Sequence, residues 1–173
     1  MSPKEFAERV EPHLGVMHRM ARRLTRSRAE AEDLAQEGLL RAFERRGSLR
    51  DPEKIRSWLL ALLRNLHLNR VRDAKPQLVV LTGGADFEHP TGDLEEEIQS
   101  RALSDELVLA LRDLPEEQAT VLWLRAVEGL SYEEIAEVMD TPVGTVRSRL
   151  SRAREGMLAR LRRHVPSAVG GRR

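Results

Sequence analysis

Hydrophobic side chains recur at steps of three and four residues in the N-terminal part of the chain, a spacing typical of amphipathic helices. The first stretch predicts a helix over residues 6–24, which Pro12 should kink or restart because its ring clashes with the preceding helical turn. The predicted buried face of this helix consists of Phe6, Val10, Leu14, Met17, Ala21 and Leu24.

Two more helices are expected before the pattern breaks. The second begins at Ser27, the first residue of a capping box, and should end at Gly47. The third begins at Asp51 and Pro52, a favoured N-cap residue followed by a favoured first residue, and runs to about residue 73. The hydrophobic positions are Leu34, Leu39, Leu40 and Phe43 in the second helix, and Ile55, Leu59, Leu62 and Leu66 in the third.

The helical periodicity stops after the third helix and resumes near residue 94. Residues 75–92 contain two prolines and three glycines, a composition typical of a linker. We therefore predict two helical modules joined by a flexible segment.

The second module has clear signals for where its helices begin and end. A helix over residues 116–127 is expected to end at Gly129. Ser131 then opens a short helix over residues 132–139 with a capping box, and Leu130 and Ile135 occupy the two positions of a hydrophobic staple. Asp140 and Thr141 form the predicted turn, and Pro142 is the expected first residue of a last helix that runs to about residue 163.

The last helix has one apolar face and one basic face. Its inward positions are Val143, Val146, Leu150, Ala153 and Met157, and its outward ones are Thr145, Ser148, Arg149 and Arg152, flanked by Arg147 and Arg154. Guanidinium groups can donate to the O6 and N7 atoms of guanine and can neutralise phosphates. A merely solvated surface is the alternative for such arginines, but the cap, staple, short helix and turn together favour a helix-turn-helix that binds DNA.

The composition favours an all-α fold. Hydrophobic residues make up 40% of the chain but aromatic residues only 3%, so the core must consist mainly of Leu, Val, Ile, Met and Ala. The absence of cysteine excludes disulfides and cysteine-ligated zinc, and no apolar run is long enough to span a bilayer. The N-terminus lacks the apolar region of a secretory signal, so we expect a cytoplasmic protein with no membrane insertion.

The net charge of +1 conceals a segregation of charge along the chain. The acidic part is Asp86, Glu88, Asp93, Glu95, Glu96 and Glu97, and the basic part is Arg147, Arg149, Arg152, Arg154, Arg160, Arg162 and Arg163. This segregation is typical of a polyanion-binding end and an acidic linker, with scattered surface charge as the alternative.

An enzyme is not expected. The five histidines are scattered, and the sequence has no His-Glu-x-x-His metal motif, glycine-rich phosphate loop or nucleophile elbow. We therefore predict no catalytic residue, no cofactor and no metal site.

Three segments of the second module carry a more specific signal. They read LPEEQ at residues 114–118, EGLSYEEIA at residues 128–136 and PVGTVRSRL at residues 142–150. Together they resemble the C-terminal domain of extracytoplasmic-function (ECF) RNA polymerase sigma factors, of the sigma-70 family, in which this domain reads the −35 promoter element. The resemblance implies that five residues contact that element: Thr145, Arg147, Ser148, Arg149 and Arg152. The chain departs from the family at Asp140, where glycine is usual.

The first module contains a matching segment, AEDLAQEGLLRAF at residues 31–43. It resembles the helix by which the family docks on the clamp of the β′ subunit of core RNA polymerase. The implied polar contacts are Asp33, Gln36, Glu37 and Arg41, and the implied apolar contacts are Leu34 and Leu40. Taken alone, Gln36 and Glu37 would be read as an exposed polar face.

The third helix resembles the family's −10 recognition element. Stepped at 100° per residue, Trp58, Asn65, Asn69 and Arg72 fall within a narrow stripe. The loop before the helix, with Ser48 and Arg50, is the counterpart of a loop that captures a flipped base in the family. Trp58 is equally well explained as a core residue.

The resemblance therefore implies a sigma factor. It would bind core RNA polymerase, direct it to promoter DNA, help to open the −10 region and be controlled by an anti-sigma factor. The implied division is an N-terminal sigma domain (1–74), an acidic flexible linker (75–101), a C-terminal helix-turn-helix domain (102–165) and a disordered tail (166–173). The alternative is a conventional helix-turn-helix regulator whose first module senses a ligand or dimerises.

Overall fold

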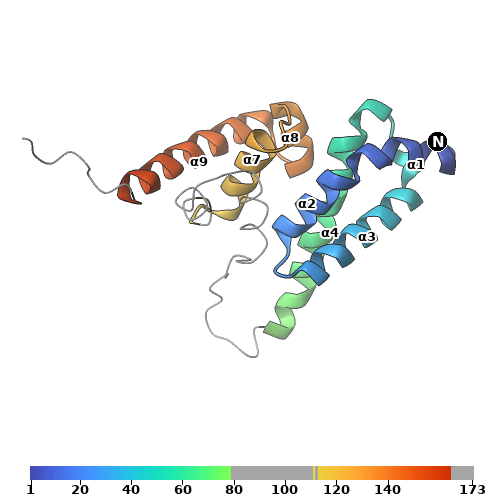
Figure 1. Ribbon diagram of the computed structural model, residues 1–173, viewed down its shortest axis with the longest axis horizontal. Helices are drawn as coiled ribbons and strands as arrows, with labels where there is room; N and C mark the ends of the chain where they lie inside the picture. Colours follow the sequence, from blue (N-terminus) through green and yellow to red (C-terminus); the bar gives the residue numbers. More distant parts are fainter. Residues whose placement is uncertain (79–110, 112, 165–173) are drawn as a thin grey trace, which may run out of the picture. The chain divides into compact units, whose positions relative to one another are not determined.

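The computed structural model describes residues 1–78, 111 and 113–164, and within these ranges every regular element is helical, as predicted. The chain divides into two compact units, the first containing helices α1–α4 and the second helices α7 and α9 and most of α8 (Figure 1). No helix in the described part of the chain is long and apolar enough to cross a membrane. The predicted linker beyond residue 78 and the predicted tail lie outside the described residues.

The expected break at Pro12 is confirmed. Helix α1 (Pro3–Val10) passes through a single 3-10 turn, Glu11–His13, into helix α2 (Leu14–Leu24). Because the tighter 3-10 turn changes the phase of the helix, Leu14 is exposed, whereas Val16 and Met20 join Met17 in the core.

Helix α3 (Arg28–Glu44) begins with the predicted cap. The backbone N–H of Glu30 donates to Ser27 Oγ (3.2 Å), and the Glu30 carboxylate accepts from the backbone N–H of Arg26 (3.0 Å). The prediction that Gly47 ends this helix is wrong. The helix ends at Glu44, and Gly47 lies in a separate 3-10 turn, Arg46–Ser48, where no left-handed residue is needed.

The buried face of α3 consists mainly of small residues. Ala31, Leu34, Gly38 and Ala42 point into the module and are fully or almost fully buried. A Cβ atom at Gly38 would lie 2.6 Å from Leu63 Cδ1 of α4, a distance that real side chains do not tolerate. Glycine at position 38 therefore permits the close packing of α3 against α4.

Helix α4 (Ile55–Leu78) follows a 3-10 turn, Pro52–Lys54, whose first amide is capped by Asp51. It continues past the predicted end near residue 73. Its fully buried leucines are Leu59, Leu60 and Leu63, whereas the expected Leu62 and Leu66 are half-buried. The buried face of α4 is rotated from the predicted one, because α4 packs against both α2 and α3 (Figure 1).

In the second module, the predicted elements are confirmed. Helix α7 (Glu116–Ala126) ends before Gly129, whose φ of 69° lies in the left-handed region. Helix α8 (Tyr132–Met139) opens with a reciprocal capping box: the Glu134 N–H donates to Ser131 Oγ (3.1 Å), and the Ser131 N–H donates to Glu134 Oε2 (2.7 Å).

Helix α9 (Val143–His164) packs along α7 through the predicted inward face. Val146, Leu150, Ala153 and Met157 are buried, and Val143 is half-buried. Pro142 was expected to be the first residue of this helix, but it is the residue just before it. The Pro142 carbonyl accepts the first helical hydrogen bonds, from the N–H groups of Thr145 (2.9 Å) and Val146 (3.2 Å).

The turn between α8 and α9 contains a strained residue. Asp140 has a φ of 48° and is the one residue other than glycine with a positive φ in the described part of the chain. A side chain in this left-handed conformation costs free energy, and a carboxylate at the end of α8 is also unfavourable to the helix dipole.

We predict that Asp140→Gly raises the free energy of unfolding of the second module by about 1 kcal/mol, because glycine adopts this conformation without strain. Chemical denaturation followed by circular dichroism would measure it. Thr141→Gly is the matched control. Because the φ of Thr141 is not positive, glycine relieves no strain there and only makes the unfolded chain more flexible, so this variant should be less stable than the wild type. A loss of stability in Asp140→Gly would contradict the prediction.

Candidate nucleic-acid and partner interfaces

The outward face of α9 carries the predicted promoter-contacting residues side by side on one helix. Arg147, Ser148 and Arg152 are exposed, and Thr145 and Arg149 are half-buried at its margin. The Ser148 hydroxyl donates to the Thr145 carbonyl (3.0 Å), which leaves its oxygen lone pairs to act as acceptors.

Two of the α9 arginines are oriented by neighbouring helices. Arg149 forms an ion pair with Glu117 in the first turn of α7, and its side chain is only 21% exposed. The Arg147 guanidinium lies over the ring of Tyr132 at 5.9 Å from the ring centroid. Glu117 and Tyr132 are not among the residues predicted from the sequence, because neither contact follows from the periodicity of a single helix.

The predicted docking face of α3 is accessible, with one exception. Asp33, Gln36, Leu40 and Arg41 are exposed, and Glu37 is half-buried. The expectation for Leu34 was wrong: this side chain is fully buried in the core of the first module and is not available to a partner. Of the two predicted apolar contacts, only Leu40, which is 59% exposed, is accessible on this face.

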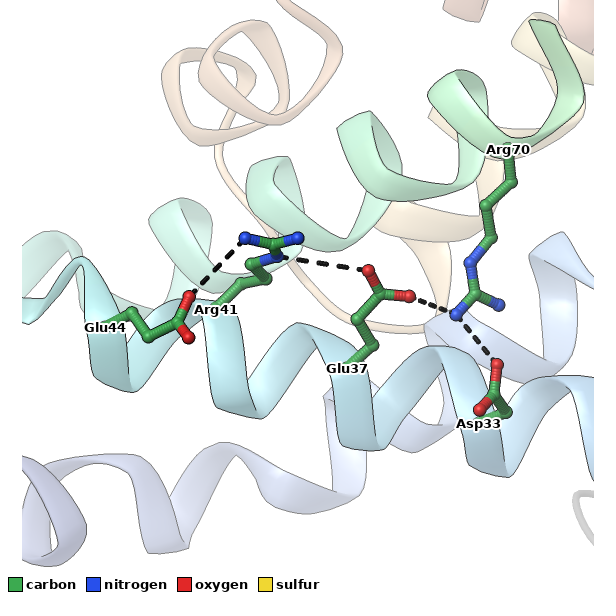
Figure 2. A network of polar contacts seen from close by, with 5 residues as sticks. All are labelled: Asp33, Glu37, Arg41, Glu44 and Arg70. Atoms are coloured by element: carbon green, nitrogen blue, oxygen red, sulfur yellow. Dashed lines mark hydrogen bonds and ion pairs between the residues drawn. The ribbon is translucent and has the colours of Figure 1, made fainter. Parts of the chain in front are cut away.

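The carboxylates of this face belong to a polar network that extends to α4 (Figure 2). Arg70 of α4 donates to Asp33 Oδ2 (2.8 Å) and to the Glu37 carboxylate. Glu37 also pairs with Arg41 (3.9 Å), which in turn pairs with Glu44 (3.5 Å). Partial burial acts to lower the pKa of Arg70, but the hydrogen bonds to Glu37 and Asp33 outweigh it, so the pKa is raised above its ordinary value.

The predicted −10 residues lie on α4 and the loop before it. Asn65, Asn69 and Arg72 are exposed along one stripe, whereas Trp58 is half-buried and packs against the hydrophobic cluster around Phe6. This packing supports the core reading of Trp58, and its contact with the −10 element stays a prediction. Ser48 and Arg50 are exposed on the loop.

The described residues contain no group of three His, Cys, Asp or Glu side chains arranged to hold a metal ion. The polar side chains identified above lie instead on exposed helix faces and in a loop. The described residues thus form a helix-turn-helix with a basic outward face, and a helical module with charged side chains along α3 and a polar stripe on α4.

Comparison with known families places both modules in one family. Residues 9–77 match the model for sigma-70 region 2, and residues 104–157 match the model for sigma-70 region 4. The helix-turn-helix therefore lies in region 4, and α3 and α4 lie in region 2, which makes the class of protein a sigma-70-type transcription factor.

Individual relatives narrow the class. The chain is 32% identical over 166 residues to the ECF RNA polymerase sigma factor SigW of Bacillus subtilis, a match that covers 91% of this chain and 89% of the relative. It is 38% identical over 138 residues to the RNA polymerase sigma-H factor of Pseudomonas aeruginosa, covering 74% of this chain and 71% of the relative. The chain belongs to the ECF family of RNA polymerase sigma factors.

Solved structures share this fold. The sigma factor RpoE of Bartonella quintana, crystallised with the anti-sigma factor NepR, aligns with a TM-score of 0.71 and 23% identity, covering 94% of this chain and 99% of that one. CnrH, in complex with the cytosolic domain of CnrY, aligns with a TM-score of 0.65 and 22% identity, covering 95% of this chain and 92% of that one.

We predict that Arg70→Gln lowers the free energy of unfolding of the first module by about 0.5–1 kcal/mol at low salt, since one cation bridges two carboxylates. The loss should shrink as salt is added, because the pairs are partly exposed. Denaturant titrations at two salt concentrations would measure both effects.

The matched control is Arg72→Gln, two residues along α4, where the side chain is exposed and its one ion pair among the described residues is with the adjacent Asp73. This variant should stay within about 0.5 kcal/mol of the wild type. Equal losses in both variants would show that the network contributes nothing specific.

Proposed function

We propose that the chain binds core RNA polymerase through α3, reads the −35 element through α9 and reads the −10 element through α4 and the loop before it. The observation that carries the proposal is the presence of both sigma regions in one chain, each with its polar face accessible. The chain performs no catalysis in this proposal, since the polymerase carries out the chemistry in the cytoplasm.

We also propose the division of labour expected from the sequence. The N-terminal sigma domain takes residues 1–74, the acidic linker residues 75–101 and the helix-turn-helix domain residues 102–165. The loop with Ser48 and Arg50 would take part in promoter opening by binding a base that has left the duplex. Extruding a base costs a few kcal/mol, and contacts with the loop would offset this free energy. Asn65 and Asn69 can offer both donors and acceptors to base edges exposed by melting.

Control by an anti-sigma factor is part of the proposal. It is supported by the solved structure of similar fold in which the sigma factor RpoE is bound to the anti-sigma factor NepR. An anti-sigma factor that covers α3 would prevent polymerase binding by competition.

Run-off transcription with purified core RNA polymerase tests the proposal as a whole. Promoters selected from a random DNA library by the reconstituted holoenzyme should be transcribed specifically only when the chain is present. Promoter binding by the chain without any dependence on core polymerase would instead indicate a conventional helix-turn-helix regulator.

We predict that Leu40→Asp weakens the affinity for core polymerase about tenfold, because it places a charge in the apolar part of the proposed contact. Fluorescence anisotropy of the labelled chain would measure the affinity. Leu158→Asp changes a similarly exposed leucine on α9 and is the matched control. Unchanged affinity in a folded Leu40→Asp variant would refute the docking role of α3.

We predict that Arg149→Ala reduces discrimination between the selected −35 sequence and a substituted one by about 5- to 100-fold, the range for losing one bidentate contact to a base. Affinity for core polymerase should be unchanged, because Arg149 lies on α9 rather than α3. Competition binding of the holoenzyme to the two duplexes would measure the ratio. An equal loss of core affinity would contradict the assignment of the modules.

A further inference from the structure

Arg149 differs from the other arginines on the outward face of α9. Arg147 and Arg152 are exposed, whereas the Arg149 side chain is 21% exposed and held by the Glu117 carboxylate. Glu117 belongs to a different helix, in the first turn of α7, and is itself 54% exposed. The pair therefore lies at the margin of the DNA-facing surface rather than inside the module.

The ion pair restricts the guanidinium without consuming all of its donors. An arginine has five N–H donors in a planar fork, and the contact with Glu117 runs through Nη2. No other partner of the Arg149 guanidinium is found among the described residues, so its remaining donors can meet the O6 and N7 acceptors of a guanine, which require the fork to lie near the plane of the base. Because the side chain is held in advance, less rotamer entropy is lost when it meets the base.

The carboxylate also affects contacts with phosphate. A negative charge beside Arg149 partly cancels its attraction for the DNA backbone, which is the part of binding that carries no sequence information. Glu117 should therefore weaken non-specific binding while it favours the base contact.

We propose that Glu117 is a specificity-determining residue that positions Arg149 toward a guanine of the −35 element and away from the phosphates. The proposal rests on the proposed function, since it assumes that α9 reads that element. Glu117 acts through Arg149 and is a positioning residue.

A different role would be purely structural, with the ion pair holding α7 against α9. The two roles predict different results. Loss of a structural contact lowers affinity for every DNA sequence together, whereas loss of positioning lowers the ratio between cognate and substituted DNA.

The experiment uses holoenzyme assembled from core polymerase and the full chain, carrying Glu117→Gln, Arg149→Ala or both substitutions. The probes are a duplex selected by the wild-type holoenzyme from a library randomised over the −35 region, and the same duplex with adenine at the guanine that Arg149→Ala ceases to distinguish. Equilibrium competition at several salt concentrations gives the specificity ratio and the salt dependence.

We expect Glu117→Gln to lower the specificity ratio about fivefold, the lower end of the value of one bidentate contact. Affinity for the substituted duplex should stay equal or rise, and the dependence of log affinity on log salt should steepen by up to about one, since Arg149 becomes free to neutralise a phosphate. In the Arg149→Ala background, Glu117→Gln should have no further effect on the ratio.

Glu116→Gln is the matched control. Glu116 precedes Glu117 in the same helical turn, is exposed and carries the same charge, but no ion pair involving it is found among the described residues. Glu116→Gln should change the net charge and the electrostatics at the start of α7 as much as Glu117→Gln does, but it should leave the specificity ratio unchanged.

Several results would overturn the inference. They are an unchanged ratio in Glu117→Gln, an equal fall in affinity for both duplexes, an equal effect of Glu116→Gln, or an effect that persists in the Arg149→Ala background. Failure of the proposed function is distinguishable, because in that case the wild-type holoenzyme itself would show no −35 preference.

Discussion

Helices α3 and α4 pack closely against each other at Gly38, and this packing determines which of their polar side chains meet. A larger residue there would force the Leu63 side chain to move, since its Cβ atom would lie 2.6 Å from Leu63 Cδ1. This approach brings Arg70 of α4 within hydrogen-bonding distance of Asp33 and Glu37 on α3 (Figure 2). As a result, the helix proposed to bind polymerase and the helix proposed to read the −10 element are packed and paired with each other within one module.

The second module follows the same principle with different contacts. The buried residues of α9 fix its rotation against α7, and this rotation leaves the basic face outward. The same packing brings Glu117 beside Arg149, so an arginine that would otherwise be one of several surface cations acquires a defined direction. Stability and recognition thus depend on the same helix pair, because the side chains that bury one face determine where the opposite face points.

Local patterns in the sequence were sufficient for the helices and their boundaries in most places. Capping boxes at Ser27 and Ser131 and the left-handed Gly129 involve residues within a few positions of each other, so their geometry is encoded locally. Errors arose where packing decides. Leu34 and Leu40 look alike in the periodic pattern, yet Leu34 is fully buried and Leu40 is the more exposed of the two by a wide margin.

The sequence by itself therefore determined the all-α class, the helix-turn-helix and the family, because these follow from periodicity, caps and motifs that lie close together along the chain. Only the tertiary structure decided which side chains of the candidate sites are accessible and which are paired. Arg70 lies 33 residues or more from its partners, and Arg149 lies on a different helix from Glu117. Such pairs depend on how two helices cross, and the repeat of a single helix contains no information about that crossing.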